Sequence, residues 1–203
     1  MQRLLIATHN QAKVHELKEF LSDLPIELVS LSDIGIDKDV VEDGKTYEEN
    51  AKKKALFFAQ LTGLPAIADD GGIEIAALNG EPGIKSKRWL GYGATDEELQ
   101  AHMVKVARKL PDDNRHASFV LVLTLALPDG RVWSSDGRVE GIIAKKPFKK
   151  YFRGFPFRLY FYLPDIKKYY HEKDLSPAEM KKYNHRFKAV KKLKPIIRRE
   201  LKS

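Results

Sequence analysis

The chain has 203 residues, 43% of them hydrophobic, which is enough for one ordinary domain with a substantial core. It contains no cysteine, which excludes disulfides and thiolate metal sites, and no apolar run approaches membrane-spanning length. The net charge of +8 is uneven: residues 145–203 hold 19 Lys and Arg against 5 Asp and Glu, and residues 1–144 are net acidic. The short N-terminal apolar stretch is no signal peptide, so we expect a soluble cytoplasmic protein.

The first half of the chain alternates short apolar runs with amphipathic segments. "RLLIAT" predicts a strand, and the apolar spacing in "AKVHELKEFLSDL" predicts a helix after a tight turn. "IELVSL" predicts a second strand, and "TYEENAKKKALFFAQLTG" predicts a helix with a Thr cap that ends at Gly63. "PAIADDG" predicts a third, buried strand that ends at its two acids.

The second half is richer in strands. "ATDEELQAHMVKVARKL" predicts a capped helix, and residues 117–144 predict two or three strands with a turn at Pro128–Gly130. "KKPFKKYFRGFPFRLYFYLP" is aromatic and basic without a clean period, and residues 176–201 predict helix on both sides of a break near Asn184 and of Pro195. The pattern predicts one α/β domain over residues 1–203, with a mixed sheet and a basic C-terminal part from about residue 145.

Polar and charged groups follow three of the predicted strands, where α/β proteins gather their ligands. "THNQAK" brings a helix N-terminus and Lys13, which suit a phosphate. "EDGKTYEEN" supplies Glu42 and Glu49, with Lys54 one turn further on, and "ADDGG" supplies Asp69 and Asp70. Adjacent residues of a strand point to opposite faces, so we expect only one of the two aspartates to face the site.

Together these groups indicate metal-assisted chemistry on a polyphosphate, because Mg²⁺ prefers oxygen ligands and usually shares them with phosphates. Taken singly, each motif also fits a structural role. A strand, turn and helix with Thr, Asn and Lys is commonplace, and an Asp-Asp pair before Gly usually forms a turn or cap.

In this order, the motifs resemble the inosine triphosphate pyrophosphatase family, and the resemblance covers nearly the whole chain. The matching stretches are "ATHNQAK", "EDGKTYEENAKKKA", "GLPAIADDGG", "NGEPGIKSKRW", "RHASFVLVL", "GRVEGII" and "NHRFKAVKKL". The resemblance implies an elongated, two-lobed α/β fold around a long mixed, twisted sheet, with a nucleotide cleft between the lobes and a homodimer. It implies Mg²⁺-assisted hydrolysis of ITP, dITP or XTP to the monophosphate and pyrophosphate, which cleanses the nucleotide pool.

The resemblance also implies roles for single residues. Asp70 is expected to bind metal and activate water, with Glu42 as a second metal ligand and Lys54 as a further catalytic group. Asp69 is expected to support the turn instead. The substrate-binding residues are expected to be Thr8, His9, Asn10, Lys13, Gly71, Phe155, Arg158, Lys181, His185 and Arg186, the last two on the base side.

The departures from the family pattern gather in the groups that read the base. Gly71 stands where the family has Ser, and Lys85 where it commonly has Tyr. "GFPFRL" stands where the family's base-closing loop reads Gly-Phe-Gly-Tyr-Asp-Pro, so Arg158 replaces an Asp. The family's substrate-binding Lys falls on Met180, with Lys181 adjacent, and its Ser-His-Arg triplet begins here with Asn184.

Because guanidinium only donates hydrogen bonds, Arg158 inverts the donor pattern if it enters the pocket, where it could meet purine O6 and N7 or a phosphate. It could equally point to solvent. Two alternatives therefore remain. One is a pyrophosphatase with altered base preference, and the other is a nucleotide- or nucleic-acid-binding protein that has lost turnover, favoured by the basic tail and by aromatics able to stack on bases. The aromatic run could also be core or dimer interface.

Overall fold

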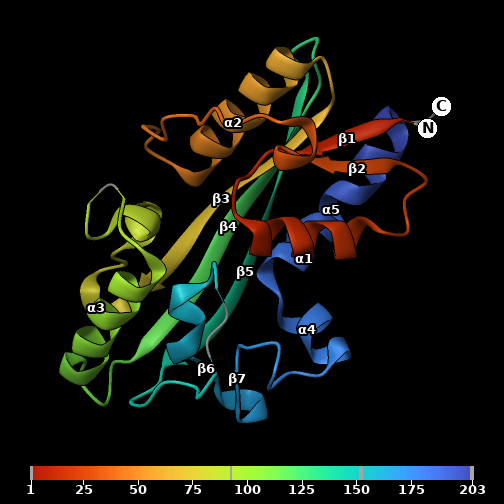
Figure 1. Ribbon diagram of the computed structural model, residues 1–203. Coiled ribbons are helices and arrows are strands. Elements are labelled where there is room, and N and C mark those ends of the chain that lie inside the picture. Colours follow the sequence, from red (N-terminus) through yellow and green to blue (C-terminus); the bar gives the residue numbers. More distant parts are fainter. Residues whose placement is uncertain (1, 92, 151–152, 202–203) are drawn as a thin grey trace. The chain divides into compact units, whose positions relative to one another are not determined.

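The structure is a computed structural model, which describes residues 2–91, 93–150 and 153–201. Along the described chain, five α-helices and seven strands follow one another (Figure 1). The helices are α1 (Gln11–Leu21), α2 (Tyr47–Thr62), α3 (Asp96–Lys109), α4 (Pro177–Tyr183) and α5 (His185–Glu200). The strands are β1 (Arg3–Ile6), β2 (Glu27–Ser30), β3 (Ala66–Ile75), β4 (His116–Ala126), β5 (Val132–Ile143), β6 (Phe161–Leu163) and β7 (Lys168–Tyr169).

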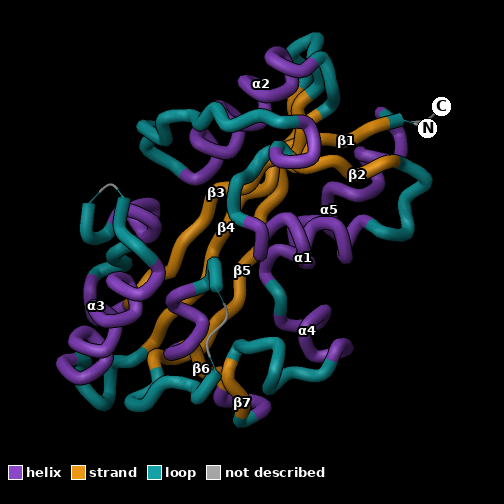
Figure 2. The backbone as a smooth tube through the Cα atoms, in the orientation of Figure 1, coloured by secondary structure: helices purple, strands orange, loops and turns teal. Residues whose placement is uncertain are grey.

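The described strands form one sheet in the order β2-β1-β3-β4-β5-β6-β7. β1 pairs in parallel with β2 and β3, whereas β6 pairs antiparallel with β5 and β7, so the sheet is mixed. Figure 2 shows β3, β4 and β5 as its long strands. The predicted α/β class with a long mixed sheet is confirmed, and the cleft between lobes stays a prediction.

The contacts of the chain divide it into two compact units that interleave in sequence. Unit 1 comprises Met1–Asp70, Leu121–Gly137 and Arg186–Ser203, and unit 2 comprises Gly71–Val120 and Arg138–His185. The strands β3, β4 and β5 contribute residues to both units. The prediction of a single domain over the whole chain is not tested by this division.

Unit 1 has a hydrophobic core on each face of its strands. The side chains of Leu4 and Ile6 of β1 pack in a cluster with α1 and α5. The side chain of Leu5 packs with Ala55 and Phe58 of α2 in a second cluster. This alternation is the two-residue period of a strand. It leaves α1 and α5 on one face and α2 on the other.

Local signals set the helix ends in both units. Thr46 caps α2 by accepting a hydrogen bond from the amide of Glu49, and Gly63 ends the helix in the left-handed conformation that glycine tolerates best. Thr95 and Glu98 form a capping box at α3. The predicted break near Asn184 separates α4 from α5. The predicted helix on both sides of Pro195 is confirmed, because α5 runs through the proline without a break.

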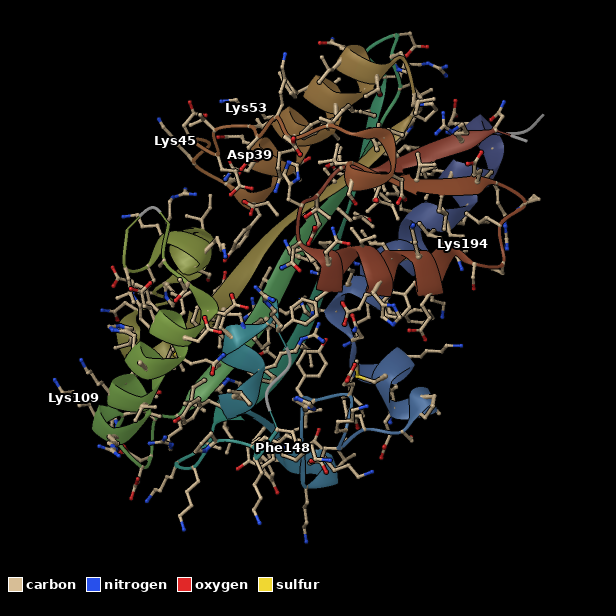
Figure 3. The ribbon with its side chains drawn as sticks, in the orientation of Figure 1. Asp39, Lys45, Lys53, Lys109, Phe148 and Lys194 are labelled. Atoms are coloured by element: carbon tan, nitrogen blue, oxygen red, sulfur yellow. The ribbon has the colours of Figure 1, made fainter. Side chains whose placement is uncertain are left out.

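Unit 2 has a core of its own, which absorbs most of the aromatic stretch. Phe157, Tyr160 and Phe161 are at most 6% exposed and pack with residues of α3, β4 and β5. Phe148, labelled in Figure 3, packs against the rings of Tyr169 and His171. These rings therefore serve as core, one of the alternatives left open by the sequence. Tyr151 and Phe152 of the same stretch lie outside the described residues.

Candidate active site

The loop between β1 and α1 fixes where the first helix begins. Asn10 caps α1, its side-chain oxygen accepting from the amides of Ala12 at 3.0 Å and Lys13 at 3.3 Å. Thr8 Oγ1 accepts from the amide of Asn10 at 3.2 Å, and exposed His9 donates through Nε2 to the Lys38 carbonyl at 2.8 Å. The cap thus places Lys13 in the first turn of α1, where the helix dipole also favours an anion.

The two adjacent aspartates of β3 point to opposite faces of unit 1, as expected for neighbours on a strand. Asp69 meets residues of α1 and α5, and Asp70 meets a residue of α2. Both lie just beyond the carboxyl end of β1, because the amide of Ala7 donates to the Ile67 carbonyl. The strand does not end at the acids, so the predicted turn there is wrong: β3 continues through Gly71 to Ile75.

Asp69 is the centre of a buried ion-pair network. Its Oδ2 lies 3.2 Å from the Lys13 ammonium and accepts from the Arg186 guanidinium at 2.9 Å. The second terminal nitrogen of the Arg186 guanidinium, Nη1, donates to Glu16 of α1. Although burial opposes the charged form, the charges of Lys13 and Arg186 hold the pKa of Asp69 well below its usual range. Asp69 is therefore an ionised anchor for two cations, and it does not support a turn.

Asp70 lies in a second group, which belongs to α2 and the loop before it. Asn50 donates to Asp70 Oδ2 at 2.9 Å, and its own side-chain oxygen accepts from the amide of Gly44 at 2.8 Å. Lys54, one helical turn after Asn50, donates to Glu42 and, at 2.6 Å, to the Asp69 carbonyl. This group brings together the predicted catalytic and metal-binding residues.

The charges in this group shift two pKa values. Burial raises the pKa of Asp70; nearby Lys54 opposes the rise, and the Glu42 charge adds to it. Burial acts to lower the pKa of Lys54, but the surrounding acids, Glu42 first, raise it overall, so the ammonium stays charged. A carboxyl group with a raised pKa beside a fixed cation suits a general base better than an ordinary surface aspartate.

The donors fit a magnesium ion in kind. Glu42 and Asp70 offer carboxylate oxygens close enough for the Glu42 charge to raise the Asp70 pKa, and a cation between them would relieve that repulsion. In the part of the chain that the structure describes, no three His, Cys, Asp or Glu side chains form a metal cluster. Mg²⁺ does not need one, because it commonly takes one or two carboxylates together with waters and substrate phosphates.

The base-side candidates of unit 2 surround a buried arginine. Arg158 is only 3% exposed, and its guanidinium lies over the rings of Phe155, at 3.7 Å, and Tyr170, at 4.7 Å. The Tyr170 hydroxyl hydrogen-bonds His185 Nδ1 at 2.8 Å, and the His185 ring stacks on Phe119. The sequence left open that the Arg158 side chain points to solvent, and its burial excludes this alternative.

The remaining candidates are placed less tightly. Lys181 is exposed on α4, next to the partly buried Met180, and Gly71 follows Asp70 on β3. Arg186 meets Glu16 and Asp69 in unit 1, and Asp69 also meets Lys13, the predicted phosphate contact, although the sequence grouped Arg186 with the base readers. Exposed Glu49 accepts from the amide of Lys45 at the start of α2, so it serves the helix end.

Sequence reasoning missed three residues that hold these groups in place: Asn50, Glu16 and Tyr170. Two of them carried a signal in their spacing. Asn50 precedes Lys54 by four residues and Glu16 follows Lys13 by three, which puts each on the helix face of a predicted site residue. Tyr170 carried none, because its partners Arg158 and His185 lie 12 and 15 residues away, in other elements of the chain.

A family model described as the Ham1 family matches residues 4–196, and the chain belongs to this family. It is 42% identical over 191 residues, 94% of this chain and 89% of the other, to a Thermus thermophilus protein named dITP/XTP pyrophosphatase. A Clostridium perfringens protein of the same name is 34% identical over 208 residues, covering all of both chains.

Solved structures give the same result. A HAM1 protein from Coxiella burnetii superposes with a TM-score of 0.81 at 35% identity, covering 97% of this chain and 98% of that one. A nucleoside-triphosphatase, or dITP/XTP pyrophosphatase, from Mycobacterium abscessus has a TM-score of 0.71 at 33% identity, over 96% of this chain and all of that one.

No helix in the described residues is both long and apolar enough to cross a membrane.

Proposed function

We propose that this chain hydrolyses the non-canonical purine nucleoside triphosphates ITP, dITP and XTP to the monophosphate and pyrophosphate. The observation that carries the proposal is the group around Asp70: a buried carboxylate with a raised pKa, held by Asn50, beside Glu42 and the charged Lys54. A protein that only binds nucleotides has no need of a water-activating carboxylate. The names of its relatives support the same activity.

The roles follow from charge and position. Glu42 and Asp70 would hold Mg²⁺, which when bound supplies Lewis-acid polarisation of the phosphoryl oxygens. Asp70 Oδ1 or Oδ2 takes the proton of the attacking water as the anhydride bond between the α- and β-phosphates breaks. Lys54 and Lys13 hold the triphosphate, and their ammonium groups stabilise the negative charge that develops on the leaving pyrophosphate.

The capping residues of α1 contribute by orientation. We assign Thr8, His9 and Asn10 to the phosphate side of the substrate, next to the amides at the start of α1. Asn10 already uses its side-chain oxygen for the cap, so it contributes by shaping this loop. Gly71 follows Asp70 and leaves that position without a side chain.

We assign the base to the Arg158 group of unit 2. Phe155 offers a ring, and His185 is oriented by Tyr170. Arg158 can donate to the two acceptors of a 6-oxopurine, O6 and N7, but adenine presents an amino group at the same edge. This arrangement favours ITP, XTP and GTP over ATP, so an altered base preference, with GTP accepted, is the second candidate function. Lys181 is kept as a phosphate or base contact from α4.

The nucleic-acid-binding alternative has less support. Phe157, Tyr160 and Phe161, which would have to stack on bases, are core residues. Several cations of the basic tail are already paired: Lys194, labelled in Figure 3, and Arg198 both meet Asp23, and Lys192 meets Asp136. We further propose that the protein acts on the cytoplasmic nucleotide pool as a homodimer, which sedimentation of the purified protein would test.

The experiment is pyrophosphate release from ITP, XTP, dITP, GTP and ATP, with Mg²⁺ and with a chelator. We expect metal-dependent release from the 6-oxopurines, abolished in Asp70→Asn, whose carboxamide cannot take the proton, while the fold and much of the nucleotide binding remain. Retained turnover in Asp70→Asn would refute the catalytic assignment. No release from any nucleotide would favour the binding protein without turnover.

A second variant separates the two candidate functions. Arg158→Asp restores the residue type that the family has at this position, and we expect it to lower the rate on GTP relative to ITP. An unchanged base profile would place the Arg158 side chain outside the base pocket.

A further inference from the structure

We propose that Asp69 is a positioning residue for substrate binding: its Oδ2 holds the Lys13 ammonium at the start of α1, charged and aimed for a phosphate. The inference rests on the proposed function, since it assumes that Lys13 binds a triphosphate. It concerns the aspartate that does not face the metal ligands, to which the sequence assigned only a turn.

The geometry of Asp69 supports this role. Its side chain is 1% exposed and its Oδ2 lies 3.2 Å from Lys13 Nζ. Its other oxygen, Oδ1, is buried and has no hydrogen-bond partner among the described residues. The charge of Asp69 is therefore balanced through Oδ2, by Lys13 and Arg186 together. A long lysine side chain with four flexible bonds needs such an anchor to present its charge at one point.

Lys13 needs an anion for a second reason. Burial lowers its pKa, and the Asp69 charge is the largest influence that raises it; Lys54 and Arg186 lower it further, and Asp70 gives the smallest opposing effect. Asp70 accepts from Asn50 on the other face of β3. Without the Asp69 carboxylate, a half-buried lysine facing two cations loses its proton at lower pH, and with it most of its attraction for phosphate.

Glu16 offers a matched control. Like Asp69 it is a buried carboxylate that meets Arg186, but it is not among the charges that shift the pKa of Lys13. Glu16→Gln therefore removes a buried negative charge that lies beside the Arg186 guanidinium, as Asp69→Asn does. If only the loss of a buried charge mattered, Glu16→Gln and Asp69→Asn would behave alike.

The experiment measures binding of inorganic tripolyphosphate to the full chain from pH 6 to pH 10. This probe has no base, so it reports on the phosphate side alone. For Asp69→Asn we expect affinity to be lost at a pH about one unit or more below that of the unmodified protein. Glu16→Gln should lose affinity at the same pH as the unmodified protein, whatever its absolute affinity, because Glu16 is not among the charges that shift the Lys13 pKa. Adding Lys13→Arg to Asp69→Asn should remove the shift that Asp69→Asn causes, because guanidinium stays charged throughout this range.

An Asp69→Asn profile identical to that of the unmodified protein, or one shared with Glu16→Gln, would overturn the inference. If Asp69→Asn does not fold, Lys13→Met is compared with the double variant Lys13→Met and Asp69→Asn, in which both charges of the pair are gone. Equal tripolyphosphate affinity supports the inference, and a further loss in the double variant overturns it. Failure of the proposed function is distinguishable, because the unmodified protein would then release no pyrophosphate from any nucleotide.

Discussion

Asn50 donates a 2.9 Å hydrogen bond to Asp70 across the boundary between α2 and β3, and both side chains are buried. The amide is itself held, because its oxygen accepts from the Gly44 backbone. A chain of two hydrogen bonds thus runs from the loop before α2 to the proposed general base. Since Asn50 can donate to the carboxylate, it favours the ionised form of Asp70 and fixes its direction.

Removing that donor should therefore change both rate and pH dependence. In Asn50→Ala the hydrogen bond that lowers the pKa of Asp70 is lost, so the pKa rises further and the base form appears only at higher pH. We expect kcat to fall about tenfold at neutral pH, roughly 1.4 kcal/mol, and the acidic limb of the kcat profile to move to higher pH. Gln60→Ala, on the exposed side of α2, is the control. An acidic limb that stays in place would show that Asn50 does not hold the base.

Gly44 should be intolerant of any side chain, for a steric reason. A Cβ at Gly44 would lie 2.6 Å from Asn50 Oδ1 and 2.9 Å from Glu49 Cβ. Asn50 is fully buried and bonded at both ends, so it cannot move aside without releasing Asp70. Gly44→Ala should reproduce the kinetic defect of Asn50→Ala in steady-state assays. Gly35→Ala strains the backbone at a φ of 67° but brings no atom within 4 Å of the added Cβ, so it tests whether a destabilising change at another glycine lowers kcat by itself. Normal kcat in Gly44→Ala would mean that this loop adjusts freely.

Glu179 should make the stability of unit 2 depend on pH. Its carboxylate accepts from Lys168 at 2.8 Å and from the Ser176 amide at 2.8 Å, and hydrogen bonds from Lys168 and Ser176 lower its pKa from 4.5 to about 2. A carboxyl whose pKa is depressed by folding stabilises the fold above its unfolded pKa, and this contribution is lost as the pH falls from about 4.5 towards 2.

The Tm difference between the unmodified protein and Glu179→Gln should therefore be present at pH 7 and vanish near pH 2. Lys168→Met should show the same trend, because it removes the strongest partner. Thermal unfolding followed by circular dichroism at a series of pH values measures it. A difference that stays constant down to pH 2 would contradict the assignment.

The sequence predicted elements whose signals are local and missed features that depend on distant chain. The caps at Thr46 and Thr95 and the glycine after α2 are local, and they are confirmed. The stretch "DDGG" predicted a turn, but β3 continues through Gly72, where the strand packs closely against Gly83 and Ser86. A Cβ on Gly72 would lie 2.2 Å from the Gly83 carbonyl and 2.3 Å from Ser86 Oγ. The residues that neighbour Gly72 in the sequence give no signal of this close contact.

The same reasoning applies to the site and to the last helix. The sequence singled out Lys13 and Asp70 because each follows a predicted strand, where ligands gather, and Lys54 because it lies about one turn beyond Glu49; their roles stay predictions. The partnership of Arg186 with Asp69 joins residues 117 positions apart and had no sequence signal. Pro195 does not break α5, because the apolar stripe of Val190, Leu193 and Ile197 packs into the unit 1 core and outweighs the lost backbone hydrogen bond.

Tyr170 provides the last prediction, because it separates base binding from phosphate binding. Its hydroxyl meets His185 Nδ1 at 2.8 Å in a fully buried position, while its ring lies on Arg158. Tyr170→Phe keeps the ring and removes the hydrogen bond that orients His185. We expect a loss of about 1 to 2 kcal/mol in the free energy of unfolding, or a Tm lower by roughly 2 to 8 °C.

In kinetics, Tyr170→Phe should raise KM for ITP several-fold and leave tripolyphosphate affinity unchanged, because His185 contacts the base and not the phosphates in the proposed arrangement. Tyr169→Phe is the matched control, because the hydroxyl of this neighbouring tyrosine donates to the Lys146 carbonyl, on the exposed side of β7. Equal weakening of ITP and tripolyphosphate by Tyr170→Phe would place His185 on the phosphate side. An unchanged KM together with a lowered Tm would make the Tyr170–His185 hydrogen bond purely structural and leave base recognition to Arg158 and Phe155.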